Sequence, residues 1–317
     1  MRFWTHDGFP FPLPDGHKFP ITKYPRLKAR LLADGTARPA DICASEPARW
    51  ELLGQVHQAA YLERVRSGAL SEREVRRLGL PWSAALVERG RRSTQGTVNA
   101  AGDAMRGGFG MNLGGGTHHA GRAAACGYCL FNDIAVAIAA LRAERTIPAH
   151  AVGPIVDGAR PRPLGRVAVI DCDVHQGDGT AELLQPDPDV FTLSLHGGAN
   201  YPFKRATSDL DIDLPTGTVD DAYLDALAGA LREVERAGVP ELVFFLAGAD
   251  PWEGDRLGRL ALTKAGLAAR DALVLDWVER CGAAVCVVLA GGYAPDVDDT
   301  VDINAATARE VARRASG

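Results

Sequence analysis

Short apolar runs, each followed by polar residues and glycines, recur along this chain from residue 111 onward. Their length and their content of β-branched residues predict strands of a parallel sheet that is buried on both faces. The clearest runs are Val167–Ile170, Val190–Leu195, Leu242–Leu246 and Ala284–Leu289. Amphipathic helices are predicted to begin near Asn132, at Thr218 or Asp220 (ending at Gly238), and near Thr263. Strands that alternate with helices predict βαβ units and an α/β fold.

The residues after each predicted strand are the most informative part of the pattern. The runs end in "LGGGTHHAG", "VIDCDVHQGDG", "LSLHGG", "FLAGAD" and "VLAGGY". In open α/β sheets, ligands bind beyond the carboxyl ends of the strands. We therefore expect these five segments to deliver polar side chains and glycines to one site at one edge of the sheet.

The first 110 residues give weaker signals. Residues 1–40 are rich in proline and aromatic residues and are predicted to form an irregular arm that leads into helices. Residues 46–104 are predicted to be mostly helical, with a break at Pro81. Residues 148–163 are predicted to be a surface loop, because strand–helix alternation resumes directly after them. We expect one domain over residues 1–317.

Charge and composition argue against several classes of function. A net charge of −5 over 317 residues gives no overall attraction to nucleic acid or to anionic membranes. No apolar run approaches the ~18 residues of a membrane-spanning helix. The N-terminus lacks the apolar region of a signal peptide. We therefore expect a cytoplasmic protein that binds neither nucleic acid nor membranes, and its oligomeric state is not predicted.

An arginine cluster and a pair of cysteines are interpreted as structural features rather than as parts of a functional site. Arg89, Arg91 and Arg92 are predicted to form a solvated face. Cys126 and Cys129 form a C-x-x-C, but no second pair accompanies them, so we interpret them as packing cysteines rather than zinc ligands. Six cysteines in a chain of this length do not indicate a disulfide framework.

Asp171, Asp173 and His175 are spaced i, i+2, i+4, so in an extended chain they share one side. Their charges would repel and shift each other's pKa unless a cation balanced them. Oxygen and nitrogen ligands suit Zn²⁺ or Fe²⁺, or Mn²⁺ with more oxygen ligands. The alternative is a capped turn at Asp178. Asp250, which follows another predicted strand, is the expected third protein ligand.

His118 and His119 follow three glycines. As adjacent histidines they suit either a site or a surface pair, and the glycines favour a crowded site. Asp171 and Asp178 could accept a hydrogen bond from the second ring N–H of these histidines. One imidazole could then act as a base and the other as an acid. Tyr293 follows two glycines, and its phenol could donate a hydrogen bond to an oxyanion. The alternative is an ordinary buried tyrosine. Together these groups predict metal-assisted hydrolysis of a carbonyl compound.

Five motifs closely resemble those of the histone deacetylase superfamily of zinc amidohydrolases. They are "GGGTHHAGRAAACGYCLFNDIAVA", "VIDCDVHQGDGT", "SLHGGANYPF", "AGADPWEGDRLG" and "LAGGYA". Their order and spacing agree from about residue 10 to about residue 305. The segment "PLPDGHKFPITKY" is most similar to bacterial members near the class IV branch.

The resemblance implies an arginase-like three-layer α/β/α domain with a central eight-stranded parallel sheet. It implies zinc ligands at Asp173, His175 and Asp250. It implies that His118 and His119 are catalytic, partnered by Asp171 and Asp178, and that Tyr293 polarises the scissile carbonyl. Substrate contacts are implied at Gly127, which receives the substrate amide, and at Tyr128 and Tyr201, which wall the channel. A structural K⁺ is implied beside the zinc, at Asp171, Asp173, His175, Ser194 and Leu195.

The expected activity is zinc-dependent hydrolysis of an N-acyl-lysine side-chain amide in a protein or peptide. Three departures from the family pattern bear on the substrate: tyrosine at 128 and 201 where Phe is common, "AGGY" in place of a longer glycine run, and no match in Ser71–Arg92 for the rim Asp that grips the substrate backbone. They affect acyl preference and substrate recognition rather than hydrolysis.

Other functions remain open. A small acylated amine such as an acetylpolyamine could be the substrate, with Glu46 or Glu88 at the mouth, or the acyl chain could be longer. A non-catalytic binding protein would be expected to lack a reacting group, and a binuclear manganese hydrolase would need more ligands.

Overall fold

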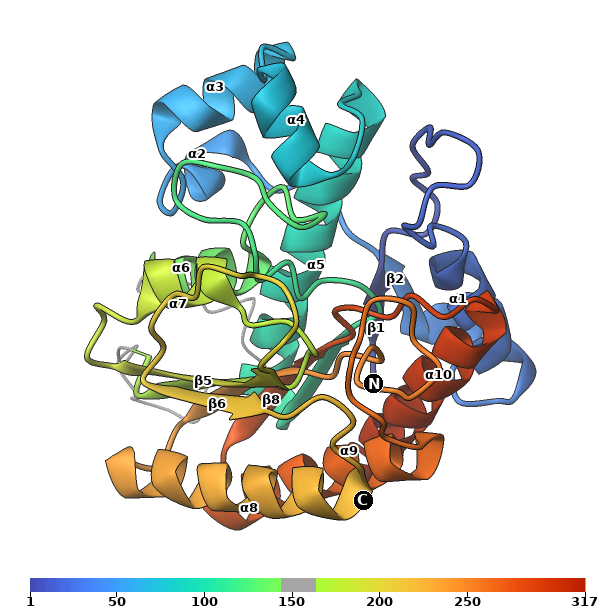
Figure 1. Ribbon diagram of the computed structural model, residues 1–317, viewed down its shortest axis with the longest axis vertical. Helices are drawn as coiled ribbons and strands as arrows, with labels where there is room; N and C mark the ends of the chain where they lie inside the picture. Colours follow the sequence, from blue (N-terminus) through green and yellow to red (C-terminus); the bar gives the residue numbers. More distant parts are fainter. Residues whose placement is uncertain (144–163, 317) are drawn as a thin grey trace, which may run out of the picture.

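The computed structural model describes residues 1–143 and 164–316. Eight strands form a single sheet that is parallel throughout, as expected, in the order β2-β1-β3-β8-β7-β4-β5-β6 (Figure 1). The strands are β1 (Phe3–Thr5), β2 (Ile42–Ala44), β3 (Phe109–Asn112), β4 (Val167–Asp171), β5 (Val190–Gly197), β6 (Leu210–Leu214), β7 (Leu242–Leu246) and β8 (Ala284–Val288). The predicted loop at 148–163 lies outside the described residues.

Helices cover both faces of the sheet and make the three layers of an α/β/α fold (Figure 1). One face carries α5 (Ala84–Gly107), α6 (Asp133–Ala143) and α7 (Asp178–Leu184). The other carries α1 (Lys23–Ala33), α8 (Asp220–Ala237), α9 (Lys264–Cys281) and α10 (Val297–Arg314). The short helices α2 (Trp50–Leu53), α3 (Ala59–Ser67) and α4 (Glu72–Leu78) lie together at one end of α5. A 3₁₀ turn, Pro39–Asp41, precedes β2.

The central strands are buried on both faces, because their side chains alternate between two apolar clusters. In β4, Val167 and Val169 join the cluster under α5 and α6, whereas Ala168 and Ile170 join the cluster under α8, α9 and α10. Both helical layers therefore hold β4 in place. The strand ends at Asp171, which is itself a predicted site residue.

The prediction of an irregular N-terminal arm is wrong for two segments. Phe3–Thr5 is a strand between β2 and β3, and α1 begins at Lys23. Phe3 is only 1% exposed and Thr5 only 4%, so this strand belongs to the core of the molecule. A strand of three residues is too short to show alternation in the sequence, which is why the pattern did not predict it.

Arg89, Arg91 and Arg92 do not form the predicted solvated face. Arg89 is 5% exposed. The three guanidinium groups lie over the rings of Tyr24, Trp50 and Phe9, respectively. They also donate to backbone carbonyls of the segments that cover α5. Arginine stacks well on aromatic rings, and the aromatic-rich N-terminal segments provide those rings.

No described helix is both long enough and apolar enough to cross a bilayer. The cytoplasmic location and the single-domain organisation stay predictions.

Candidate metal centre and active site

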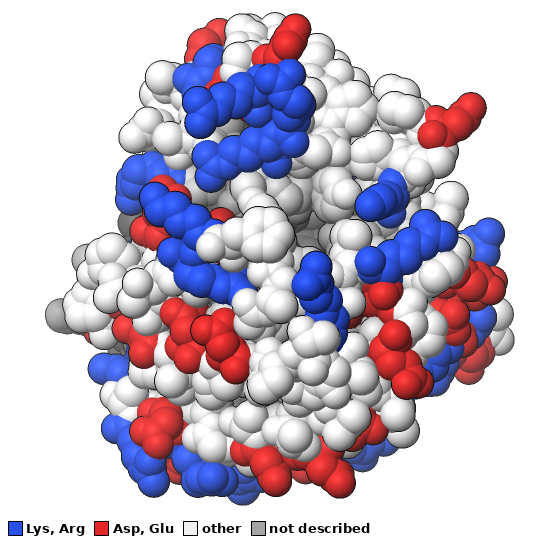
Figure 2. All heavy atoms as spheres, viewed as in Figure 1, with Lys and Arg blue, Asp and Glu red and all other residues white. Residues whose placement is uncertain are grey.

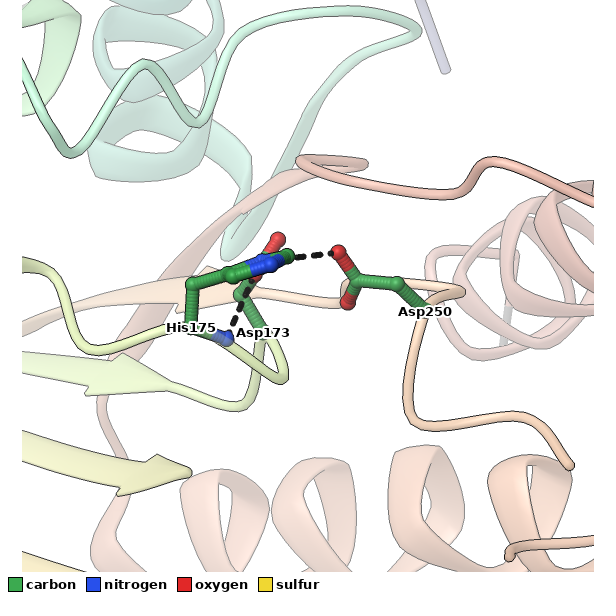
Figure 3. A group of neighbouring side chains, drawn as sticks. All are labelled: Asp173, His175 and Asp250. Carbon is green, nitrogen blue, oxygen red and sulfur yellow. Dashed lines mark hydrogen bonds and ion pairs between the residues drawn. The ribbon is translucent and has the colours of Figure 1, made fainter. Parts of the chain in front are cut away.

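Asp173, His175 and Asp250 come together at the carboxyl edge of the sheet (Figure 3). Asp173 and His175 lie between β4 and α7, and Asp250 follows β7. Their ligand atoms all lie within 4.8 Å of one another, and all three residues are buried. His175 Nδ1 is 2.9 Å from Asp173 Oδ1 and 3.3 Å from Asp250 Oδ2. The i, i+2 spacing and the adjacent strand thus deliver the three predicted ligands to one point.

The surroundings of this group fit a divalent cation. Asp250 Oδ2 is a buried carboxylate oxygen without a hydrogen-bond partner among the described residues. The other carboxylate oxygens are oriented by backbone N–H groups: Val174 donates to Asp250 Oδ1 and Gly291 to Asp173 Oδ2. Two carboxylates and one imidazole are the donor set of a catalytic zinc site with three protein ligands, and they also suit Fe²⁺.

The pKa shifts in this group show how strongly its charge needs to be balanced. Burial, together with the charge of Asp173, raises the pKa of Asp250. Burial alone would lower the pKa of His175, but its hydrogen bond to Asp173 and its ion-pair contact with Asp250 raise that pKa to about 10. Without a cation, the group therefore holds protons, which a metal ion displaces when it binds.

The tandem histidines have the predicted carboxylate partners. His118 Nδ1 lies 2.7 Å from Asp171 Oδ2, and His119 Nδ1 lies 2.6 Å from Asp178 Oδ1. Each carboxylate can accept a hydrogen bond from Nδ1–H, which leaves Nε2 of each ring available for proton transfer. The two ring centroids are 4.1 Å apart. Asp171 also contacts the group Asp173–His175–Asp250, called the metal group below, because Asp171 Oδ1 accepts a hydrogen bond from the backbone N–H of Asp173.

The two histidines differ in proton affinity. Burial and the positive charge of His118 lower the pKa of His119 to about 4. Burial opposes protonation of His118 too, but the charges of Asp171 and Asp173 outweigh it and raise its pKa to about 9. A cation held by Asp173 would reduce that rise. The environments give one proton acceptor and one proton donor, which is the pattern of an acid–base pair.

Tyr293 follows β8 and Gly291-Gly292 at the same edge. A Cβ atom at Gly291 would lie 1.9 Å from Asp250 Oδ2, so only glycine lets the chain pass this close to the metal group. Asp255 accepts the backbone N–H of Tyr293 at 2.6 Å. Burial and the charges of Asp173 and Asp250 raise the pKa of the Tyr293 phenol well above its usual range. The hydroxyl therefore keeps its proton and can donate a hydrogen bond.

Gly127 and Tyr128 form the turn of a tight hairpin closed by Cys126 and Cys129. Both turn residues have positive φ, 51° and 67°. A Cβ atom at Gly127 would lie 2.4 Å from Cδ2 of His119, so the turn presses directly on the histidine. The two thiols are free and buried, as expected for packing cysteines, and Cys126 Sγ contacts the hydroxyl of Tyr201.

Comparison with known proteins identifies the family. The model of the histone deacetylase domain matches residues 17–308. The chain belongs to the histone deacetylase family, which is a family of enzymes. Which branch it belongs to stays a prediction.

Several relatives span most of the chain. An uncharacterized protein of Picosynechococcus is 39% identical and covers 93% of each chain. Histone deacetylase 2 of Arabidopsis thaliana is 31% identical, over 87% of this chain and 70% of its own. The histone deacetylase-like amidohydrolase of Pseudomonas aeruginosa is 32% identical, over 89% and 74%. The crystal structure of a histone deacetylase homologue from Aquifex aeolicus has the same fold, with a TM-score of 0.81 at 23% identity over 98% and 84%.

A cavity of about 570 Å³ opens over this site of the histone deacetylase domain. Eight predicted site residues line it: His118, His119, Gly127, Tyr128, Asp173, His175, Tyr201 and Tyr293. Asp171, Asp178 and Asp250 do not line the cavity, but they contact or lie close to residues that do. The rings of Tyr128 and Tyr293 are 5.8 Å apart, and Tyr201 lies 5.2 Å from His119. The two tyrosines predicted to wall the channel thus flank Tyr293 and His119.

Ser194 and Leu195, predicted to help bind a monovalent cation, lie on β5 beside β4. Ser194 pairs with Asp171 in register, and both Ser194 and Leu195 are buried. The Ser194 hydroxyl is 2.9 Å from His196 Nδ1. This places them next to the metal group, and their role toward K⁺ stays a prediction.

Asp133 is a supporting residue that the sequence analysis missed. Its carboxylate accepts the backbone N–H groups of Gly116 and Thr117 and the hydroxyl of Thr97. Asp133 therefore anchors the glycine loop that presents His118. An acidic residue in the first turn of a helix is the signal that could have indicated it, but that position usually serves only as a cap.

Proposed function

We propose that this protein hydrolyses the side-chain amide of an N-acyl-lysine in a protein or peptide, with Zn²⁺ as cofactor, or Fe²⁺ in its place. The observation that carries the proposal is the buried Asp173–His175–Asp250 group in contact with a cavity that also holds both histidines and Tyr293. A non-catalytic protein would not need this complete set. The predicted K⁺ would add positive charge beside Asp171.

A divalent cation held by Asp173, His175 and Asp250 would polarise the acyl carbonyl and lower the pKa of water. His119, which is neutral at pH 7, accepts a proton from the attacking water. His118 gives its proton to the departing lysine amine. Tyr293 donates its hydroxyl proton in a hydrogen bond to the oxyanion. Asp171 and Asp178 orient the two imidazoles, and their hydrogen bonds hold each proton on Nδ1.

The substrate side chain is bound in the outer part of the cavity. Tyr128 and Tyr201 flank its methylene groups, and the carbonyl of Gly127 accepts the substrate amide N–H. The positive φ of Gly127 and its contact with His119 fix this turn beside the reacting groups and support the assignment.

The charge of the cavity favours a lysine on a peptide over a cationic polyamine. Lys23, Arg76, Arg77, Arg89 and Arg259 line it, and Asp173 is the one acidic residue among the described lining residues. Figure 2 shows lysine and arginine side chains on several sides of the central hollow. Neither Glu46 nor Glu88 lines the cavity; both carboxylates lie near Arg92 instead. A polyamine would approach these cations without an acidic partner at the mouth.

The test compares acetyl-lysine peptides with acetylpolyamines, using zinc-loaded protein and protein stripped by a chelator. We expect the loaded protein to cleave the peptides with the higher kcat/KM and the stripped protein to be inactive until zinc is restored. Preferential cleavage of acetylpolyamines would refute the peptide assignment. Absence of hydrolysis at confirmed zinc occupancy would refute the proposed function itself.

A further inference from the structure

Two buried cations lie in the same cavity as the reacting groups, and the reaction described above uses neither of them. Lys23, the first residue of α1, is 3% exposed, and Arg89 of α5 is 5% exposed. Both line the cavity together with His6 and Tyr24. The charge of each lowers the pKa of His6, so the three groups lie close to one another.

The polar contacts of these cations are incomplete. Lys23 Nζ donates to the carbonyl of Ala290 at 3.1 Å and otherwise faces the rings of Tyr24 and Tyr293. Arg89 Nη1 makes long contacts to two backbone carbonyls, at 3.3 and 3.4 Å, and the Tyr24 phenol is a further hydrogen-bond partner of the guanidinium group. Arg89 Nη2 and His6 Nδ1 are buried without a hydrogen-bond partner in the described part of the chain.

Neither cation has an acidic partner at ion-pair distance within residues 1–143 and 164–316. Asp7, whose charge reaches Arg89, is itself ion-paired with Lys28. Burying a positive charge is costly unless a negative group compensates it. Two such charges around one cavity, with an unpartnered guanidinium nitrogen, form a site that an anion from outside would complete.

The position of Lys23 connects this site to the reaction. Ala290, whose carbonyl accepts a hydrogen bond from Lys23, directly precedes Gly291, and the backbone N–H of Gly291 donates to Asp173 of the metal group. The Lys23 ammonium also lies 5.9 Å from the centre of the Tyr293 ring. This distance puts the Lys23 ammonium within reach of an acyl chain whose carbonyl lies at Tyr293. Apolar side chains of Phe11, Leu86 and Phe131 also line the cavity and suit the methylene groups of such a chain.

We propose that the enzyme accepts acyl groups that end in a carboxylate, of the glutaryl-lysine type, and binds that carboxylate between Lys23 and Arg89. This inference rests on the proposed function and names the acyl class of that reaction. The step balances as an ordinary hydrolysis: the amide C–N bond breaks, the water oxygen joins the acyl carbon and a proton goes to the amine. Glutarate and lysine are the products.

The experiment compares one peptide carrying glutaryl-lysine, valeryl-lysine or acetyl-lysine. Valeryl has the same number of carbons as glutaryl but lacks the carboxylate. We expect the wild-type kcat/KM for glutaryl to exceed that for valeryl by about tenfold, as charge-assisted hydrogen bonds to a buried carboxylate allow. In Lys23→Met, the ratio of glutaryl to valeryl kcat/KM falls toward one. The control Lys264→Met removes a lysine that pairs with Asp299 and Asp302 outside the cavity, and it keeps the wild-type ratio.

A second readout does not depend on catalysis. Glutarate is added to the metal-free protein, and the melting temperature is measured. We expect glutarate to raise the melting temperature of the wild type and of Lys264→Met, but not that of Lys23→Met.

The outcomes separate the two proposals. Cleavage of acetyl-lysine or valeryl-lysine peptides with no preference for glutaryl would overturn the acyl class and leave the proposed function standing. A glutaryl preference that survives in Lys23→Met would overturn the assignment of the site. No cleavage of any peptide at full zinc occupancy would refute the proposed function, whereas glutarate-dependent stabilisation that requires Lys23 would still support the carboxylate site.

Discussion

At the scale of single residues, the site consists of groups whose charges are tolerated only together. Asp173, His175 and Asp250 are buried close to one another, and the proposed cation would bind the Asp250 oxygen that lacks a hydrogen-bond partner. His118 and His119 differ in pKa because His118 faces two carboxylates while His119 faces one and the positive charge of His118.

Tyr293→Phe removes only the hydroxyl that the mechanism assigns to the oxyanion. We expect kcat for an acetyl-lysine peptide to fall by about 10²–10³, as after loss of an oxyanion-hole donor. Zinc content and KM should change little, since the ring and the backbone bond to Asp255 remain. Steady-state kinetics with metal analysis checks this, and an unchanged kcat would remove Tyr293 from the mechanism.

Asp250→Asn removes one negative ligand but keeps the side-chain shape. We expect zinc affinity to fall by at least about tenfold, because a catalytic zinc site needs three protein ligands and only two charged or imidazole ligands remain. Competition with a chromogenic chelator measures the affinity. Asp296→Asn, at the start of α10 away from the cavity, is the matched control. Wild-type affinity in the Asp250 variant would contradict the ligand assignment.

The sequence motifs predicted which polar residues meet at the carboxyl edge of the sheet, but not all of the residues that hold them there. Asp171, Asp173 and His175 stand in one short motif, so their spacing alone places them on one side of the chain. Asp133, Lys23 and Arg89 act through partners far away in sequence, and no local pattern marks such contacts.

At the scale of elements, the long buried strands followed the sequence pattern and the short ones did not. The predicted bounds of β4, β5, β7 and β8 differ from the observed ones by two residues at most. β1 and β2, with three residues each, hold one side of the sheet through their neighbours rather than through their own periodicity, whereas β3 was indicated by the run that ends in "LGGGTHHAG". β6 and α10 were not predicted individually either. Tertiary pairing decides such segments.

His57, which lies between α2 and α3, connects these helices to the segment that contains the Gly127–Tyr128 turn. Its Nδ1 lies 2.9 Å from the carbonyl of Gly121, and its Nε2 accepts the backbone N–H of Asn132. Only the neutral ring can make both bonds, because protonated Nε2 would face another N–H group. Burial lowers the pKa of His57 to about 4.

This pKa sets the sign of a pH effect on stability. The unfolded histidine titrates near 6.5, so the stabilisation is complete above pH 6.5 and is lost as the pH falls toward 4. We expect a contribution of up to about 3 kcal/mol over that interval. Urea unfolding at pH 7 and pH 4.5 should show a smaller loss in His57→Gln than in the wild type. Equal losses in both proteins would show that His57 does not carry this dependence.

At the scale of the whole molecule, an acidic protein carries a basic cavity. The net charge is −5, yet Arg76, Arg77 and Arg259 stand on the cavity lining, and all three are exposed. Figure 2 shows both kinds of charge on one face, with basic side chains around the hollow and many acidic side chains away from it. The overall composition therefore gave no indication of the local charge that a substrate meets.

We expect acetyl-lysine peptides with Asp or Glu beside the acetyl-lysine to be cleaved with a higher kcat/KM than peptides flanked by Lys or Arg, by about tenfold at low salt. The preference should shrink as ionic strength rises, because the arginines are exposed. Arg259→Ser, which removes a side chain with no partner in the described structure, should reduce it. A preference for basic flanks would contradict this view of the mouth.

The central claim is that one divalent cation is bound by Asp173, His175 and Asp250 at the carboxyl edge of the sheet. Anomalous X-ray diffraction at the zinc edge, from crystals of the zinc-loaded protein, tests it most directly. We predict one strong peak per chain, between the carboxylate oxygens of Asp173 and Asp250 and Nδ1 of His175. A pair of peaks at the site, or a single peak elsewhere with these three side chains unbound, would contradict the account.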